Sequence, residues 1–187
     1  MTDEATAQIE AAVRTILTAI GEDPDRPGLQ ETPARVARMY AEVFSSVQQP
    51  QFTNYKLFPT ESQDDLVLVK DIPFYSMCEH HLLPFFGHVH VAYVPQHKQI
   101  IGLSKIARLV DYCAKRPNVQ ERLTSAIADE LQTILDPAGI AVEVQARHMC
   151  MEMRGIQKTG SQTVTASFRG TLNNAEAKAE FQRRVQL

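Results

Sequence analysis

Residues 76–81 read Ser-Met-Cys-Glu-His-His, and a second short stretch, His148-Met149-Cys150, lies far downstream. The first stretch holds a thiol and an imidazole three residues apart, Cys78 and His81, and the second adds the thiol of Cys150. Two thiolates and one imidazole form a ligand set that suits zinc, and three protein ligands leave the fourth tetrahedral position open, as in catalytic sites. Spacing alone does not show that two distant fragments meet. A fragment of a structural zinc site, or unrelated buried side chains, fits it equally well.

Two further histidines favour chemistry over a purely structural metal. His80 and His148 remain after three ligands are assigned, and each is close in sequence to one of those ligands. Histidine titrates near neutral pH and is the usual proton carrier, so a metal-activated water beside such imidazoles is a hydrolytic arrangement. His88 and His90 lie on the next predicted strand, and we expect them to be structural or surface residues.

The length, composition and net charge of the chain argue against several classes of protein. The chain has 187 residues, 44% hydrophobic and 22% charged, which is ordinary for a globular protein. A net charge of −3 argues against a nucleic-acid binder, and no apolar run is long enough for a membrane span or a signal segment. Three cysteines do not suggest a disulfide framework, so we expect reduced thiols and a cytoplasmic protein. Cys113 is predicted to be a small core residue.

Apolar periodicity predicts a mixed architecture. Helices are expected over residues 1–20, from Thr32 as N-cap to about Ser45, from Ser104 onward, from Asn118 to about Leu135, and at the C-terminus. Strands are expected over residues 65–70, 87–94, 140–153 and 163–172. This order predicts an α+β fold with an antiparallel sheet and helices on one face, in which residues 1–50 form an N-terminal helical arm and residues 51–187 the main domain. Along the strand expected over residues 140–153, the polar side chains change from one face to the other near Arg147. This change predicts either a β-bulge or burial of both faces of the strand.

Ser104 and several cationic residues have two interpretations. Ser104, Lys105 and Arg108 lie at a helix start, where phosphates bind well, but a solvated polar face is the simpler interpretation. Arg154 follows the second cysteine and fits either a phosphate contact beside the metal or an exposed charge at a strand end.

The pair Gln120-Glu121 has a similar ambiguity. Asn118 followed three residues later by Glu121 resembles a capping box, and spacing alone favours that interpretation. A carboxylate at this place would also suit guanine, because it accepts hydrogen bonds from the ring N–H and the exocyclic amine.

Four separated motifs together resemble GTP cyclohydrolase I. They are Met-Cys-Glu-His-His at 77–81, Gly-Leu-Ser-Lys-Ile at 102–106, Val-Gln-Glu-Arg-Leu at 119–123, and His-Met-Cys-Met at 148–151 followed by Arg154-Gly155. The resemblance extends from about residue 30 to the C-terminus. It implies the tunnelling fold, with a four-stranded antiparallel sheet and two helices on one face, and a toroidal homodecamer with active sites at subunit interfaces.

The resemblance also implies a reaction and a role for each candidate residue. GTP and water would give 7,8-dihydroneopterin triphosphate and formate, the first step of folate- or tetrahydrobiopterin-type pterin synthesis. Zn²⁺ would be held by Cys78, His81 and Cys150. Guanine would be held by Gln120 and Glu121, which replaces the capping interpretation. The triphosphate would be held by Lys105, Arg108, Arg154 and, from a neighbouring subunit, Arg35. Protons would be moved by His148, at the imidazole ring of guanine, and by His80, with Ser104 acting near the ribose.

Two other functions fit part of the pattern. One is a non-catalytic nucleotide sensor stabilised by a structural zinc ion, which a fourth protein ligand to the metal would indicate. A related tunnelling-fold enzyme acting on another pterin or purine would share the Gln120-Glu121 pair, but the cations predicted for a triphosphate favour GTP.

Overall fold

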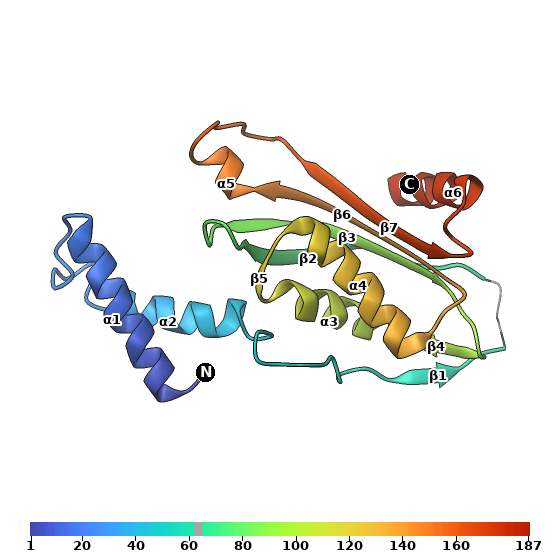
Figure 1. Cartoon of the computed structure of the whole chain (residues 1–187), viewed down its shortest axis with the longest axis horizontal. Helices are drawn as coiled ribbons and strands as arrows, with labels where there is room; N and C mark the ends of the chain where they lie inside the picture. Colours follow the sequence, from blue (N-terminus) through green and yellow to red (C-terminus); the bar gives the residue numbers. More distant parts are fainter. Residues whose placement is uncertain (62–64) are drawn as a thin grey trace.

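One antiparallel sheet organises the computed structural model, which describes residues 1–61 and 65–187. Its long strands are β2 (Val67–Cys78), β3 (Pro84–Val94), β6 (Gly139–His148) and β7 (Thr163–Gly170), hydrogen-bonded in that order (Figure 1). Each of these strands runs antiparallel to its neighbour. The predicted α+β class and the four-stranded antiparallel sheet of the tunnelling fold are therefore confirmed.

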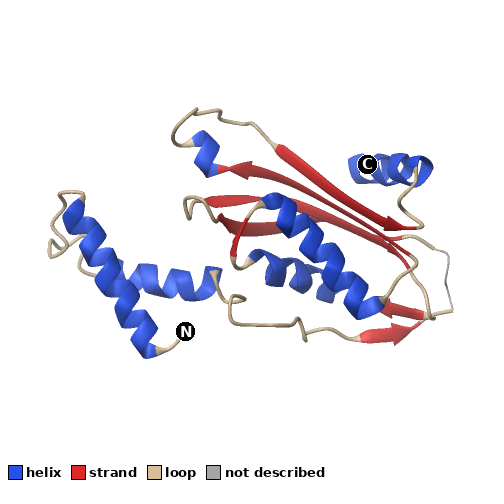
Figure 2. Cartoon of the chain, in the orientation of Figure 1, coloured by secondary structure: helices blue, strands red, loops and turns tan. Residues whose placement is uncertain are grey.

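Two helices cover one face of this sheet, as expected. They are α3 (Leu103–Ala114) and α4 (Gln120–Leu135), and both lie over the same side of the strands (Figure 2). Their apolar stripes and the inward residues of the strands form the main core, which includes Val89, Val91, Val142, Val144, Ile106, Leu109, Leu123 and Ile127. Cys113 lies in this core and is 2% exposed, so its predicted role as a small buried residue is confirmed.

The opposite face carries the C-terminal helix α6 (Ala175–Gln186). Phe181 of this helix packs with Ala92 and Ala141 in a second, smaller core. The alternation predicted for residues 87–94 explains this arrangement, because successive strand side chains point to opposite faces. His90 is buried on this side, whereas His88 is exposed, so neither lies at the predicted metal site.

The N-terminal helices α1 (Asp3–Ala19) and α2 (Thr32–Val43) extend to one side of the sheet (Figure 1). No residue of α1 is buried, and Ile16 is 59% exposed although its spacing predicts an inward position. Met39 of α2 is likewise exposed. Thr32 is the first helical residue and not the predicted N-cap. The apolar stripes predicted for this arm are therefore only partly covered within one chain.

Short elements complete the fold and correct the strand predictions. β1 (Leu57–Pro59) pairs with β4 (Gln99–Ile101) in a separate ribbon, and β5 (Pro117–Asn118) adds a short parallel strand to the end of β2. The strand expected over residues 65–70 continues through a bulge after Val69 to Cys78. The strand expected to reach Met153 instead ends at His148 and is followed by the helical turn α5 (Met149–Glu152).

Close contact between β3 and β6 depends on the absence of a side chain at Gly87. A methyl group there would lie 1.9 Å from the carbonyl oxygen of Gln145, and backbone cannot move aside without opening the ladder. We expect Gly87→Ala to lower the free energy of unfolding by about 2–4 kcal/mol, measured by urea denaturation. In the control Gly28→Ala, the added methyl group meets only the end of the exposed Arg26 side chain, so little change is expected. Equal stability of the two variants would contradict this tight β3–β6 approach.

None of the helices in the described residues has the length and apolar character needed to span a membrane.

Candidate metal centre and active site

Cys78, His81 and Cys150 come together at one end of the sheet. Their potential ligand atoms, one from each side chain, all lie within 4.8 Å of one another. The strand register explains the meeting, because Met77 pairs with Pro84 and Phe85 pairs with His148, which brings the β2–β3 turn beside the end of β6. Two thiolates and one imidazole at this separation fit a tetrahedral metal ion with one position left for a non-protein ligand.

The turn after β2 is held by the backbone. The N–H of Cys78 donates to the carbonyl of Leu83, and the N–H of Leu82 donates back to the carbonyl of Cys78, each at 2.8 Å. Leu82 adopts a left-handed conformation with φ of 51°, which closes the turn. The N–H of Glu79 donates to the carbonyl of Asn118 at 3.0 Å and ties the turn to the segment before α4. These bonds fix the direction in which Cys78 and His81 leave the backbone.

A paired-charge contact adds a second tie between this turn and α4. Arg122 donates from its two terminal nitrogens to both carboxylate oxygens of Glu79, at 2.6 and 3.1 Å. These bonds lower the pKa of the Glu79 carboxyl. Sequence analysis missed the pair, because Glu79 is visible inside the motif but nothing in the sequence connects it with a particular arginine.

α5 explains the change of polarity near Arg147. Arg147 donates from Nε to the buried carboxylate of Glu152 at 2.8 Å, and this ion pair closes the single helical turn. The turn places Cys150 toward Cys78, and the local conformation is neither the bulge nor the doubly buried strand that the polarity predicted. Arg154 therefore follows a helical turn and does not lie at a strand end, and it reaches the site, since its Nη1 lies 2.8 Å from Nε2 of His81.

Loss of the ion pair in α5 should weaken metal binding. Hydrogen bonds from Arg147 lower the pKa of Glu152. A carboxyl with a lowered folded-state pKa stabilises the fold above its unfolded-state pKa, and this stabilisation disappears as the pH falls through the folded-state value. We expect Glu152→Gln to bind zinc about tenfold more weakly at neutral pH, measured by chelator competition. Its deficit in thermal stability relative to the wild type should vanish in acid.

The matched control for Glu152→Gln is Asp129→Asn, which breaks an ion pair to Arg169 on the exposed side of α4 and should leave zinc affinity unchanged. Equal zinc affinity in Glu152→Gln and the wild type would contradict a role for α5 in holding Cys150.

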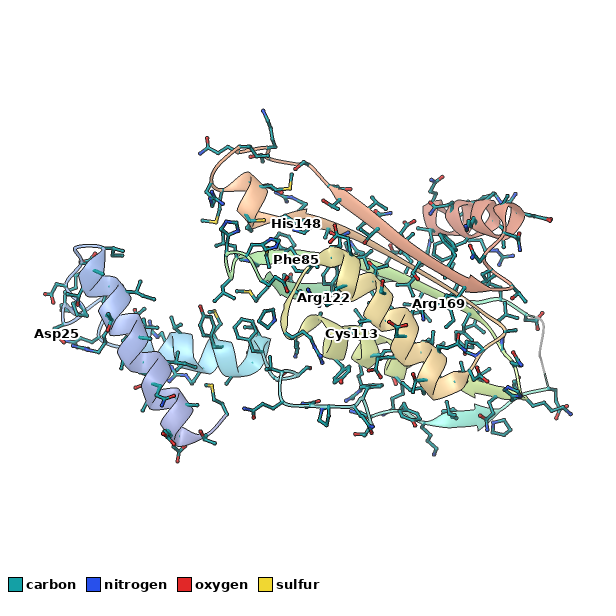
Figure 3. The ribbon with its side chains drawn as sticks, viewed as in Figure 1. Asp25, Phe85, Cys113, Arg122, His148 and Arg169 are labelled. Carbon is teal, nitrogen blue, oxygen red and sulfur yellow. The ribbon has the colours of Figure 1, made fainter. Side chains whose placement is uncertain are left out.

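His148 lies beside the ligand cluster in a defined orientation. Its ring stacks on Phe85 with centroids 4.9 Å apart and planes only 2° from parallel, and Figure 3 shows the two side chains together near the start of α4. Its Nε2 lies 2.7 Å from Oε1 of Gln120. Burial lowers the pKa of His148, and the negative charge of Glu121 partly opposes that effect.

His80 and Glu121 are both exposed near the metal ligands. His80 is exposed, with Nδ1 3.7 Å from the sulfur of Cys78. Glu121 is exposed in the first turn of α4. The predicted capping box is absent, since the N-cap position is Val119 and Asn118 donates instead to the carbonyl of Cys113. The side chain of Glu121 is therefore not used as a cap.

Four other predicted site residues lie elsewhere in the single chain. Ser104, Lys105 and Arg108 begin α3, whereas the other end of that helix adjoins the metal cluster, since Ser76 donates to the carbonyl of Ala114. At a rise of about 1.5 Å per residue, the backbone of Lys105 is about 14 Å from that end. The ammonium group of Lys105 contacts Asn54 at 2.7 Å.

Arg35 lies on α2 and forms an exposed ion pair with Glu31. One chain therefore brings together the metal ligands, His80, His148, Gln120, Glu121 and Arg154, but not Arg35 and the residues at the start of α3.

Comparison with known proteins assigns the family. The sequence profile of GTP cyclohydrolase I matches residues 9–186, so the match begins earlier than the resemblance found in the sequence, which starts near residue 30. A protein from Lactiplantibacillus plantarum named GTP cyclohydrolase 1 is 66% identical over 180 residues, covering 96% of this chain and 95% of that protein. Proteins of the same name from Enterococcus faecalis and Geobacillus kaustophilus are 56% and 57% identical, covering 97% and 93% of both chains respectively. The chain therefore belongs to the GTP cyclohydrolase I family of hydrolases.

Proposed function

We propose that the chain converts GTP and water to 7,8-dihydroneopterin triphosphate and formate, with Zn²⁺ bound by Cys78, His81 and Cys150. The observation that carries the proposal is the approach of these three ligands within 4.8 Å, directly beside an oriented histidine. When bound, the metal would supply Lewis-acid activation of water near neutral pH. Among the described residues, no fourth ligand from histidine, cysteine or a carboxylate joins the cluster. Three protein ligands favour a catalytic metal over a structural one.

The remaining side chains would bind the substrate and move protons. His148 would donate a proton to the imidazole ring of guanine, and His80 would carry protons during loss of formate. Glu121 would accept hydrogen bonds from the N–H groups of guanine. Arg154 would contact the triphosphate close to the metal ligands. Holding the base and the triphosphate at two ends would orient the reacting carbon, which is a positional contribution to the rate.

Completion of the site would require other subunits. Ser104, Lys105 and Arg108 lie at the far end of α3 from the metal ligands, and Arg35 lies on the arm. We propose that a neighbouring subunit supplies Ser104 near the ribose and Lys105 and Arg108 at the triphosphate, and that Arg35 likewise comes from a neighbour. The exposed apolar residues of the arm, such as Ile16 and Ile20, support burial against another copy.

The sheet supports a ring as the form of assembly. Within the described residues β7 has a neighbour on one side only, and β5 covers only Met77 and Cys78 of β2. Since the four long strands alternate in direction, β7 of one subunit can pair antiparallel with β2 of the next, and repetition closes a ring. We propose the toroidal homodecamer of the family, with residues 1–50 as an intersubunit arm and residues 51–187 as the catalytic domain.

The proposed setting is the reducing cytoplasm, at the first step of folate- or tetrahydrobiopterin-type pterin synthesis. All three cysteines are free thiols, which supports this setting.

The direct test incubates zinc-loaded protein with GTP and follows formate release together with pterin fluorescence after oxidation. We expect both products in equal amounts. Formate without pterin would reduce the proposal to the hydrolytic half of the reaction, and neither product with zinc still bound would overturn it. Native mass spectrometry of the same sample tests the decamer, and an active monomer would contradict the shared site.

A further inference from the structure

Glu79 fastens the β2–β3 turn to the start of α4 in two ways. Its backbone N–H donates to the carbonyl of Asn118 at 3.0 Å. Its carboxylate accepts two hydrogen bonds from Arg122, at 2.6 and 3.1 Å. Asn118 lies two residues before α4, and Arg122 lies in the first turn of that helix. One residue of the β2–β3 turn is therefore bonded to the same short segment through its main chain and its side chain.

The residues next to Glu79 carry the chemistry proposed for this site. Cys78 and His81 are the proposed metal ligands of this stretch, and His80 is a proposed proton carrier. Nδ1 of His80 lies 3.7 Å from the sulfur of Cys78, and its ring meets that of His81 edge to face with centroids 6.4 Å apart. Both contacts are made within the same stretch, so they move with it. The place of His80 relative to the substrate therefore depends on how the turn itself is held.

The partner of Glu79 is next to a residue proposed to bind the substrate. Arg122 directly follows Glu121, the proposed guanine contact, in the first turn of α4. The inner side of this helix is packed in the main core, where Leu123 and Ile127 are fully buried. Because the helix is rigidly packed, a bond to Arg122 also sets the distance to Glu121.

The pair is too exposed to serve mainly stability. The side chain of Arg122 is 56% exposed and that of Glu79 is 32% exposed. Water screens an ion pair of this kind, so its contribution to folding is small. The two parallel N–H···O contacts nevertheless fix direction as well as distance. A contact with defined geometry and little effect on folding suits a positional role.

We propose that Glu79 is a positioning residue whose ion pair with Arg122 fixes the spacing between the β2–β3 turn, which carries His80 and His81, and the helical turn that carries Glu121. The inference rests on the proposed function, in which these groups bind the substrate and move protons. A displacement of about 1 Å among such groups can lower a rate about 100-fold. Loss of the pair should therefore slow the reaction although every group proposed to contact GTP or the metal remains.

Steady-state kinetics of charge variants tests this role. We expect Glu79→Ala and Arg122→Ala each to lower kcat about 5- to 50-fold, with KM for GTP changed less than about twofold. The double variant Glu79→Arg with Arg122→Glu restores an ion pair with its charges exchanged, and its kcat should return to within about threefold of the wild type. Wild-type kcat in the single variants, or a double variant as slow as the singles, would overturn the proposal.

Two measurements without turnover separate positioning from loss of the fold or of the metal. We expect both single variants to hold one equivalent of zinc per chain and to unfold within about 3 °C of the wild type. Amide hydrogen exchange in residues 78–83 of the zinc-loaded protein should be faster in the single variants and should slow again in the double variant. Unchanged exchange in this stretch would overturn the hold of Glu79 on the turn.

Asp129→Ala is the matched control, because it breaks an ion pair between the same helix and Arg169 of β7. Asp129 lies seven residues beyond Arg122, about 10 Å along α4, so kcat and exchange in residues 78–83 should stay at wild-type values. An equal loss of kcat in Asp129→Ala and Glu79→Ala would overturn the specific role of Glu79. Failure of the proposed function gives a different result, since the wild type would then form neither product while the difference in exchange between the wild type and Glu79→Ala would persist.

Discussion

Cys150→Ser is expected to abolish both formate release and pterin formation, with zinc content falling from one equivalent per chain toward zero. The sulfur of Cys150 is one of only two thiol ligands in the cluster of three, so its loss leaves a single thiolate and an imidazole. Because the bound metal would supply the activation of water in the proposed reaction, we expect turnover to fall by at least about 10³-fold. Elemental analysis of the dialysed protein and the two product assays measure these losses separately.

The same site predicts a pH dependence of metal binding. Burial of the Cys150 thiol is the main cause that raises its pKa, and the neighbouring Cys78 raises it further. A metal binds the thiolate, so binding must displace this proton, and zinc affinity should rise with pH through the neutral range. Titration in buffers of different ionisation enthalpy should report proton release on binding. Release of no protons would contradict a thiol protonated before binding.

Cys113→Ala provides the matched control for Cys150→Ser. Cys113 is the other cysteine outside the Cys-Glu-His-His motif, and burial raises its pKa to about 12, so it stays a thiol in the core. Its replacement should cost some stability but no zinc. A Cys150→Ser protein with a full equivalent of zinc and normal turnover would overturn the assignment of the metal centre.

The sequence predicted the cluster of three side chains better than it predicted the backbone that brings them together. Cys78, His81 and Cys150 were identifiable because soft ligands are rare and their types point to one chemistry. The route that brings Cys150 to Cys78 was not identifiable. It depends on the pair formed by Arg147 and Glu152, in which a polar residue is buried because a partner satisfies it.

Gln120 illustrates a second limit of sequence analysis. The structure buries Gln120 against β6 and β7, and it leaves Glu121 exposed, because successive residues of a helix point in different directions. Contacts with strands more than twenty residues away, as between Gln120 and Val144, cannot be inferred from local spacing.

The proposed oligomer would explain the remaining mismatch. Periodicity correctly predicted α1 and α2, but the residues expected to face inward, such as Ile16 and Met39, are exposed in one chain. A helical arm of this length is too small to bury a core alone. Its apolar stripe therefore indicates packing against a partner chain and not against the core of the same chain. Ser104, Lys105 and Arg108 are consistent with the same reasoning, because they are predicted ligands without a site within reach.

His148→Ala should retain zinc and lose turnover, which distinguishes proton transfer from metal binding. The imidazole stacks on Phe85 and bonds to Gln120, and it is not one of the three clustered ligands, so its removal leaves the metal site intact. General acid catalysis by a positioned side chain contributes about 10²–10⁴-fold, and we expect kcat to fall within that range with zinc at one equivalent. Formate and pterin should fall together if His148 acts before ring opening.

The control for His148→Ala is His88→Ala, which removes an exposed imidazole from β3 outside the site and should leave both products unchanged. Near-normal turnover in His148→Ala would assign the proton to another group, and His80, 3.7 Å from the sulfur of Cys78, would be the next residue to replace. Loss of formate in both His148→Ala and His80→Ala, with zinc retained in both, would instead indicate that the two imidazoles act in sequence before the carbon leaves. Continued formate release without pterin in His80→Ala alone would place that residue after the hydrolytic half. The product that disappears in each variant therefore shows at which stage of the reaction each histidine acts.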